Sequence, residues 1–252
     1  MSPERTSGGD PSRTLELLWR ASSPGPRRGP RPGLSVDAVV AAATGLADAE
    51  GLDGLTMRRV AAALGVAPMT LYTYVPGKAE LLDLMVDDVY ARTPRAATGG
   101  RPWRDRLVAV AEENRALYTA HPWVAEVSIL RPPLGPGLMG KYEHELSALE
   151  GLGLTDLEMD SALTYLLGFV QSNARDAADA AAQQASALSD EQWWAANAPL
   201  LERVFDAAAH PIAARVGAAA GEVHGAAYSP AHAFEFGLAR VLDGLAALIE
   251  SR

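Results

Sequence analysis

The chain has 252 residues and no Cys, and its 22 basic and 31 acidic residues give a formal net charge of −9. This length suits one large or two small domains. The lack of Cys excludes disulfides, thiolate zinc sites and Cys nucleophiles, and it leaves a reducing cytoplasm as the expected compartment. The acidic total argues against a general nucleic-acid coat, because non-specific DNA binding depends on neutralising phosphates, unless the charge is unevenly distributed.

Residues 1–33 contain six Arg, three acids and frequent Pro, for a net charge of +3. Such a composition buries too little apolar surface to offset the entropy of ordering, so we expect a mostly disordered arm with at most one short turn around Leu15–Trp19. The arm could enter a DNA minor groove or remain a solvated tail.

Residues 34–93 change to a helical pattern. Ser35 can cap a first helix that Gly51 ends. A second helix is expected at 57–64 and a third at 68–74, with Pro68 at its first position, where the missing N–H costs nothing. A fourth helix should follow Pro76-Gly77, over 78–93.

Residues 94–252 are rich in Ala and carry long helical patterns. Thr155 with Glu158 and Ser189 with Gln192 have the spacing of capping boxes, and Ser229-Pro230 marks another helix start. No segment alternates apolar and polar residues as a strand would, so the fold is predicted to be all-α. The predicted helices are 102–120, 122–130, 136–150, 156–187, 190–209 and 230–250.

No membrane or export segment is expected. The longest uncharged stretch, residues 60–77, is interrupted by Gly65, Pro68 and Pro76 and cannot be a membrane-crossing helix. The amino terminus lacks the continuous apolar core of a secretory signal. We therefore expect a cytoplasmic protein without a membrane partner.

The helices at 57–64 and 68–74, joined by a three-residue turn that starts with Gly65, have the spacing of a helix-turn-helix. In that motif the second helix lies in the DNA major groove. The resemblance to a family is carried by Leu55-Thr-Met-Arg-Arg-Val-Ala61, Leu64-Gly-Val66, Thr70-Leu-Tyr72, Tyr74-Val75, Lys78 and Leu81-Leu82. This stretch closely resembles the DNA-binding domain of the tetracycline-repressor (TetR) family. The segments His121-Pro-Trp123, Arg131-Pro-Pro-Leu-Gly135 and Phe234-Glu-Phe-Gly-Leu238 resemble the tetracycline-repressor type of carboxy-terminal core.

The resemblance implies roles for individual residues. Arg58 corresponds to a position that often reaches a base edge, and Met69 and Thr70 lead the recognition helix. Tyr72 and Tyr74 correspond to phosphate contacts, and Lys78 opens the fourth helix where a phosphate would be favoured. Pro68 and Thr73 are not shared with the tetracycline repressors themselves, so a different operator is expected. The predicted DNA-binding residues are Arg58, Pro68, Met69, Thr70, Tyr72, Thr73, Tyr74 and Lys78.

The region 94–252 has 12 basic and 20 acidic residues and should stay clear of DNA. The resemblance implies that the helices at 156–187 and 230–250 form a four-helix bundle across a twofold axis, which fits the reading of a palindrome by a homodimer. Burial of their apolar stripes within one monomer is the alternative. The other helices could enclose a small-molecule cavity of apolar walls with a few polar groups. The predicted ligand-binding residues are Trp123, Tyr142, Tyr165, Phe169, Gln171, Asn173 and Trp194.

Enzymatic motifs are missing from the sequence. No His has a Glu three residues before it, as di-metal helical sites require, and no Gly-x-Ser-x-Gly elbow or phosphate-binding Gly loop occurs. The tetracycline repressors bind magnesium with the drug, but their metal-contacting His has no clear counterpart in this chain. No cofactor, metal site or catalytic residue is therefore predicted.

The sequence thus predicts three parts: a disordered arm (1–33), a helix-turn-helix DNA-binding domain (34–93) and a helical ligand-binding and dimerisation domain (94–252). The predicted function is a repressor that a small-molecule effector releases from a palindromic operator. The alternatives are a ligand-independent regulator, an activator, and a DNA-binding module whose core binds a protein partner.

Overall fold

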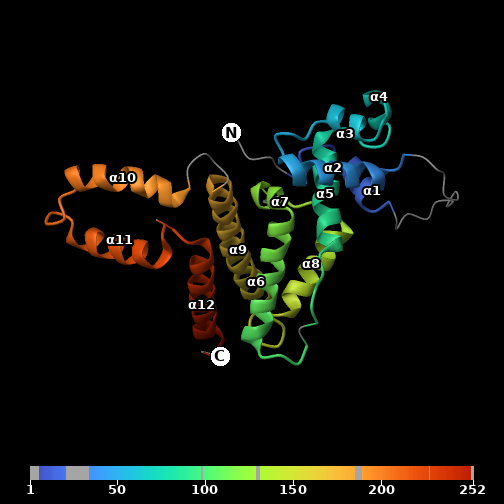
Figure 1. Cartoon of the computed structure of the whole chain (residues 1–252). Coiled ribbons are helices and arrows are strands. Elements are labelled where there is room, and N and C mark those ends of the chain that lie inside the picture. The colour runs from blue at the N-terminus through green and yellow to red at the C-terminus, as the bar shows by residue number, and fades with distance from the viewer. Residues whose placement is uncertain are drawn as a thin grey trace.

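The computed structural model describes residues 6–20, 34–97, 99–128, 131–184, 189–226 and 228–250, without the side chains of 190 and 191. Within this part of the chain the fold is all-α and contains no β-strand, as the sequence predicts. Figure 1 shows α2–α5 gathered at one end of the molecule and the longer helices α6, α9 and α12 side by side in its middle. The helices are α1 (Pro11–Leu18), α2 (Val36–Glu50), α3 (Met57–Ala63), α4 (Pro68–Leu71), α5 (Lys78–Arg92), α6 (Trp103–Ala120), α7 (Pro122–Glu126), α8 (Pro136–Ser147), α9 (Asp156–Gln184), α10 (Asp190–Val204), α11 (Pro211–His224) and α12 (Pro230–Ile249).

Local caps explain where the first large helix begins and ends. The Ser35 side chain accepts a hydrogen bond from the Ala38 N–H, so it satisfies one of the free donors at the start of α2. At the other end Gly51 adopts φ 71°, a left-handed conformation that favours glycine. The predicted helix 36–50 is confirmed.

The core of the molecule forms where α9 packs against α6 and α12, and where α8 packs against α5. Its largest fully buried side chains include Trp123 on α7, Phe234 on α12 and Leu166 on α9. Helix α8 packs against both α5 and α9, and α7 packs against both α2 and α9, so these two helices connect the helix-turn-helix end to the long helices.

The prediction of a mostly disordered arm with at most one short turn is wrong for residues 6–20, which include the helix α1. Asp10 accepts a hydrogen bond from the Arg13 N–H, and Pro11 occupies the first helical position of α1. Leu17 and Leu18 are buried, and α1 packs against α5. The average composition of residues 1–33 concealed this local helix, whereas residues 21–33 lie outside the described residues.

Helix α11 was not predicted from the sequence. It contains Gly217 and Gly221, which lower helix propensity, and none of its residues is buried. With α10 it extends away from the rest of the molecule in Figure 1.

Several predicted helix ends also differ from the observed ones. The helix predicted at 122–130 ends at Glu126, and the one predicted at 190–209 ends at Val204. The predicted capping boxes are confirmed, because Thr155 and Glu158 exchange hydrogen bonds, as do Ser189 and Gln192. For α9, residues 185–187 lie outside the described residues.

Candidate nucleic-acid interface and pocket

Helices α3 and α4 form a compact helix-turn-helix. The Thr56 side chain caps α3 by accepting the Arg59 N–H at 3.3 Å. Gly65 adopts φ 66°, and the following Val66 N–H donates to the Ala61 carbonyl at 3.0 Å, which closes the turn. Met57, Val60 and Ala61 of α3 and Leu71 of α4 are buried, so both helices are held by apolar contacts with the core.

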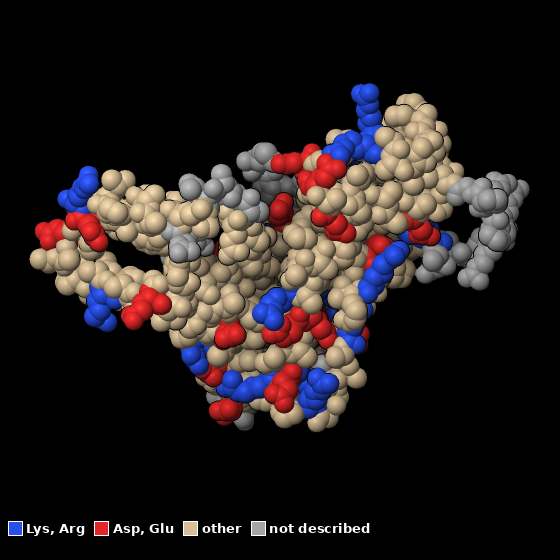
Figure 2. Space-filling model, viewed as in Figure 1, with Lys and Arg blue, Asp and Glu red and all other residues tan. Residues whose placement is uncertain are grey.

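The outer face of α4 presents uncharged side chains to solvent. Met69 is 75% exposed and Tyr72 is 44% exposed, while Pro68, Thr70 and Thr73 are also exposed. In Figure 2 the surface over α4 is free of charged groups, and Lys and Arg side chains lie beside it. Such a face can approach base edges without burying an unpaired carboxylate.

The two neighbouring arginines of α3 have different surroundings. Arg59 is ion-paired with Glu50 and also donates to the Gly54 carbonyl at 3.1 Å. The bond with Glu50 raises the pKa of Arg59 and lowers that of Glu50. Arg58 points to solvent on the same short helix. Of the two, Arg58 is therefore the one whose exposed guanidinium is placed for contact with a binding partner of α3 and α4.

The predicted recognition helix 68–74 is shorter than expected. The α-helix ends at Leu71, and residues 72–74 continue as turns in which the Tyr74 N–H bonds to the Leu71 carbonyl at 2.9 Å. Tyr74 is half-buried and packs against the core, unlike Tyr72. The Lys78 ammonium lies 3.4 Å from the Leu52 carbonyl oxygen, to which it donates.

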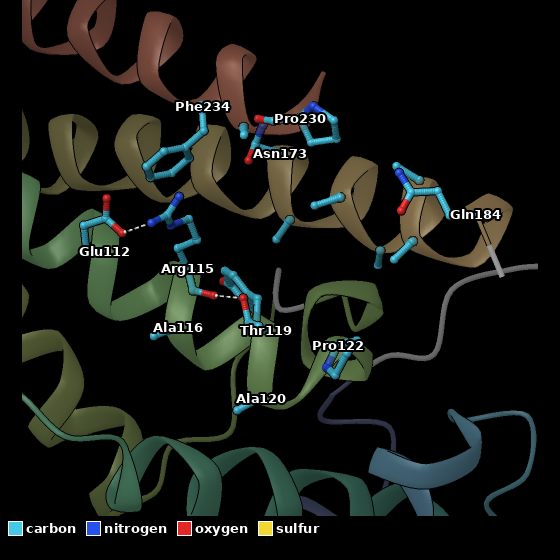
Figure 3. A pocket seen from close by; sticks show the side chains of 17 residues that line it. Glu112, Arg115, Ala116, Thr119, Ala120, Pro122, Asn173, Gln184, Pro230 and Phe234 are labelled. Atoms are coloured by element: carbon cyan, nitrogen blue, oxygen red, sulfur yellow. Dashed lines mark hydrogen bonds and ion pairs between the residues drawn. The ribbon is translucent and has the colours of Figure 1, made fainter. Parts of the chain in front are cut away.

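A pocket of about 790 Å³ opens between α6, α7, α9 and α12 (Figure 3). Eight Ala side chains from α6, α9 and α12 and the ring of Phe234 make most of its wall apolar. Burial raises the pKa of Tyr118, another lining residue, so its hydroxyl stays neutral. The lining residues are Glu112, Arg115, Ala116, Tyr118, Thr119, Ala120, Pro122, Asn173, Ala174, Ala177, Ala178, Ala180, Ala181, Gln184, Pro230, Ala231 and Phe234.

The polar groups of the pocket are fixed by bonds among themselves. Arg115 pairs with Glu112 at 2.7 Å and lies over the Phe234 ring, 4.5 Å from its centroid (Figure 3). The buried Asn173 donates from Nδ2 to the Pro230 carbonyl at 2.9 Å, which ties α9 to the start of α12. An apolar cavity with a few oriented polar groups is typical of a small-molecule site.

Of the seven predicted ligand residues, only Asn173 lines this pocket. Phe169 stacks on Phe234 from behind the wall, with ring centroids 5.8 Å apart. Gln171 donates to the Ala125 carbonyl at 2.9 Å, so its amide nitrogen is directed at the protein backbone. The others lie elsewhere: Trp123 in the core, Tyr142 beside Asp160, Tyr165 exposed on α9 and Trp194 against Trp193 on α10.

The sequence missed most of the pocket because its wall is built from Ala. Large aromatic residues and amides are typical ligand contacts and were therefore predicted. Ala carries no such signal, and it contributes to a pocket because its small side chain leaves space between the helices. The row Ala174, Ala177, Ala178 and Ala181 has the three- and four-residue spacing of one helix face, which could have indicated a groove.

One connection joins the pocket to the helix-turn-helix end. Pro122 lines the pocket, and both of its neighbours bond to one carboxylate oxygen of Asp48 on α2. The distances to Asp48 Oδ1 are 2.7 Å from His121 Nδ1 and 2.7 Å from Trp123 Nε1. Because Trp123 is buried in close-packed surroundings, a movement of Pro122 is transmitted through its two neighbours to Asp48.

No described group of three or more His, Cys, Asp or Glu side chains is arranged to hold a metal ion. Among the described helices, none combines the length and apolar character needed to cross a membrane.

Two family models match the chain. The model for bacterial regulatory proteins of the tetR family matches residues 39–85, and the tetracyclin repressor-like C-terminal domain matches residues 94–249. The chain belongs to the tetracycline-repressor (TetR) family. Its helix-turn-helix and helical core are therefore those of a transcriptional regulator, and the resemblance stated from the sequence is confirmed.

Named relatives of this TetR-family protein agree with that assignment. The HTH-type transcriptional repressor DrrR1 of Streptomyces coeruleorubidus is 44% identical over 253 residues, which cover 100% of this chain and 91% of DrrR1. ActR of Streptomyces coelicolor, solved in complex with actinorhodin, aligns with a TM-score of 0.70 at 28% identity and covers 86% of this chain and 98% of its own. BioQ, solved with its double-stranded DNA operator, aligns with a TM-score of 0.52 at 28% identity, over 60% of this chain and 91% of its own.

Proposed function

We propose that this TetR-family protein is a homodimeric repressor that leaves a palindromic operator when a small organic molecule occupies the pocket between α6, α7, α9 and α12. The observation that carries the proposal is the position of Pro122. It lies in the pocket wall, while His121 and Trp123 on either side bond to Asp48 of the DNA-binding region. A ligand that displaces Pro122 moves α2 and changes the separation of two recognition helices in a dimer.

The pocket favours a particular class of ligand. Its wall of Ala, Pro and Phe suits a flat, mostly apolar molecule, and Thr119, Asn173 and Gln184 supply hydrogen-bonding groups at its edge. ActR binds actinorhodin in a related fold, which supports a small organic effector here. The ion pair of Arg115 with Glu112 makes the pocket mouth neutral overall, so a highly charged ligand is disfavoured.

Exposed apolar side chains on α9 and α12 support the dimer. Leu157 and Tyr165 are 76% and 61% exposed, and with Ala162, Leu245 and Leu248 they surround an apolar hollow of about 360 Å³ between the two helices. Apolar surface of this kind is stabilised by a partner. We infer that the same surface of a second copy covers it across a twofold axis.

The DNA part is tested with an operator selected from a randomised duplex pool by the full-length protein. Arg58→Ala should weaken binding at least fivefold, because a bidentate contact of Arg to guanine contributes about 1–3 kcal/mol. Arg59→Ala is the matched control, since Arg59 is held by Glu50 and should change affinity less than threefold. Equal effects of the two substitutions would contradict the assigned interface.

The pocket is tested by a thermal-shift screen of small aromatic compounds, since a bound ligand stabilises the folded state by mass action. Ala178→Phe fills the pocket and should abolish the shift caused by any hit, while operator binding persists. Ala182→Phe, on the same helix but outside the wall, should leave the shift unchanged. A hit that shifts both variants equally binds elsewhere, and a hit that shifts stability without releasing DNA would support the ligand-independent alternative.

A further inference from the structure

Residues 6–20 precede both segments that match the family models. This segment lies across α5 and reaches the loop between α7 and α8. It includes α1 and is called the N-terminal strap below.

Both ends of the strap bond to the loop before α8. The buried Thr6 lies with its Oγ1 2.6 Å from the Arg131 carbonyl oxygen and 3.2 Å from that of Ser128. The Trp19 indole Nε1–H donates to the Leu134 carbonyl at 2.8 Å. The loop carbonyls that these groups satisfy belong to the segment that follows α7, the helix whose Pro122 lines the pocket.

The middle of the strap bonds to α5. The Ser7 N–H donates to Asp83 Oδ1 at 2.7 Å, and the Asp10 N–H donates to Glu80 Oε1 at 3.1 Å. Asp83 is fully buried and Glu80 nearly so, and buried carboxylates are costly unless donors satisfy them. The strap backbone supplies one donor to each of the two carboxylates, and these two bonds fix the middle of the strap on α5.

The apolar side of α1 adds a third attachment. Leu17 and Leu18 belong to the same buried cluster as residues of α2 and α5, and Arg20 is ion-paired with Asp37 at the start of α2. One short segment thus contacts α2, α5 and the loop between α7 and α8.

From these contacts we propose that the N-terminal strap is a coupling device that ties the DNA-binding helices to the effector domain. It restricts the movement of α5 relative to the segment 131–134, and so it sets how far a displacement at the pocket changes operator affinity. The proposal rests on the proposed function, and it replaces the two sequence-based alternatives for residues 6–20, a minor-groove arm and a solvated tail.

The test removes the side-chain hydrogen bonds that Thr6 and Trp19 make to the loop, while the bonds of the Thr6 N–H to the Ser128 carbonyl and of the Ser7 hydroxyl to the Pro132 carbonyl remain. Thr6→Val deletes the Oγ–H donor with little change of shape, and Trp19→Phe deletes the indole N–H. Arg13→Ala is the matched control, because Arg13 makes an exposed ion pair with Glu16 inside α1. In the full-length protein, the double variant should speed amide exchange in α5 and the start of α8 at least tenfold and change affinity for the selected operator at least threefold, with the control unchanged.

The outcomes separate this proposal from the proposed function. Unchanged amide exchange in the double variant overturns the proposed coupling role of the strap. This outcome holds even when the protein selects no operator from the duplex pool. Failure of the wild-type protein to select any operator contradicts the proposed function, while the exchange measurement still decides the strap. A loss of affinity with unchanged exchange and a flatter salt dependence would instead make the segment a DNA arm and overturn the coupling role. Where the double variant is poorly folded by circular dichroism, Thr6→Val alone gives the exchange measurement.

Discussion

The close contact between α5 and α8 gives the sharpest stability prediction. Gly137, on α8, is buried, and a Cβ built at this position lies 1.9 Å from the Asp87 carbonyl oxygen and 3.0 Å from the Ala91 nitrogen. Cβ atoms in proteins essentially never approach another heavy atom within 3.0 Å, so Gly137→Ala must move α8 away from α5 by about 1.1 Å. Both obstructing atoms are backbone, so no side chain can rotate to relieve the clash.

The same shift strains two hydrogen bonds. The N–H groups of Gly137 and Leu138 donate to the Asp87 carboxylate at 3.2 and 2.8 Å. Overpacking costs about 1–3 kcal/mol, and a weakened bond to a buried charged group about 1.5 kcal/mol more. We therefore expect Gly137→Ala to lower the free energy of unfolding by about 2.5–4.5 kcal/mol.

Urea unfolding followed by circular dichroism measures this effect. Gly140→Ala is the control in the same helix, because Gly140 is exposed and its added Cβ lies 3.6 Å from Arg95 Nη1. It should raise stability by about 0.5–1 kcal/mol through helix propensity. A Gly137→Ala protein within 1 kcal/mol of wild type would refute the close approach of α5 and α8.

Three further predictions use buried polar groups. Burial raises the pKa of Asp83 to about 6, so the folded state binds more protons than the unfolded state between about pH 4 and 6. Stability should fall as pH rises through that window, and Asp83→Asn should flatten this part of the curve in urea titrations; an equally steep curve would refute the assignment. Asp48→Ala leaves the Trp123 indole N–H buried without an acceptor and should cost about 1–3 kcal/mol, measured as a loss of unfolding free energy that an exposed-site control does not share. Lys141→Met breaks the buried 2.6 Å pair with Glu145 and should cost about 3 kcal/mol, and adding Glu145→Leu should recover most of it; no recovery would show that the charge pair is not the cause.

The sequence predicted what local chemistry determines. Caps such as Ser35 and the capping box of Ser189 act within one helical turn, and the predicted starts of α2 and α10 therefore agree with the structure. Helix ends without such a mark, as at Glu126, were extended too far because apolar residues continued beyond them.

The sequence could not predict features that depend on distant partners. Trp123 is a residue type that often contacts ligands. Its indole N–H instead donates to Asp48, which lies 75 residues away in the chain on α2. Thr6 is likewise polar and near the amino terminus, yet it is buried because the carbonyls of Ser128 and Arg131 accept its hydrogen bonds. Neither partner is visible in the local pattern of residues.

The buried acids of α5 change the meaning of the net charge. Residues 34–93 carry eight acidic and four basic residues, and by composition alone this net negative charge is unfavourable for a DNA-binding region. Three of those acids, Glu80, Asp83 and Asp87, are buried beneath the N-terminal strap and the start of α8, where each accepts a hydrogen bond from at least one backbone N–H group. Because they face the protein interior and Arg58 faces solvent, the negative charge presented to phosphates is smaller than the sequence total. The acids that lower the net charge of this region therefore attach α5 to its neighbours, while the exposed helix α4 carries no charged side chain.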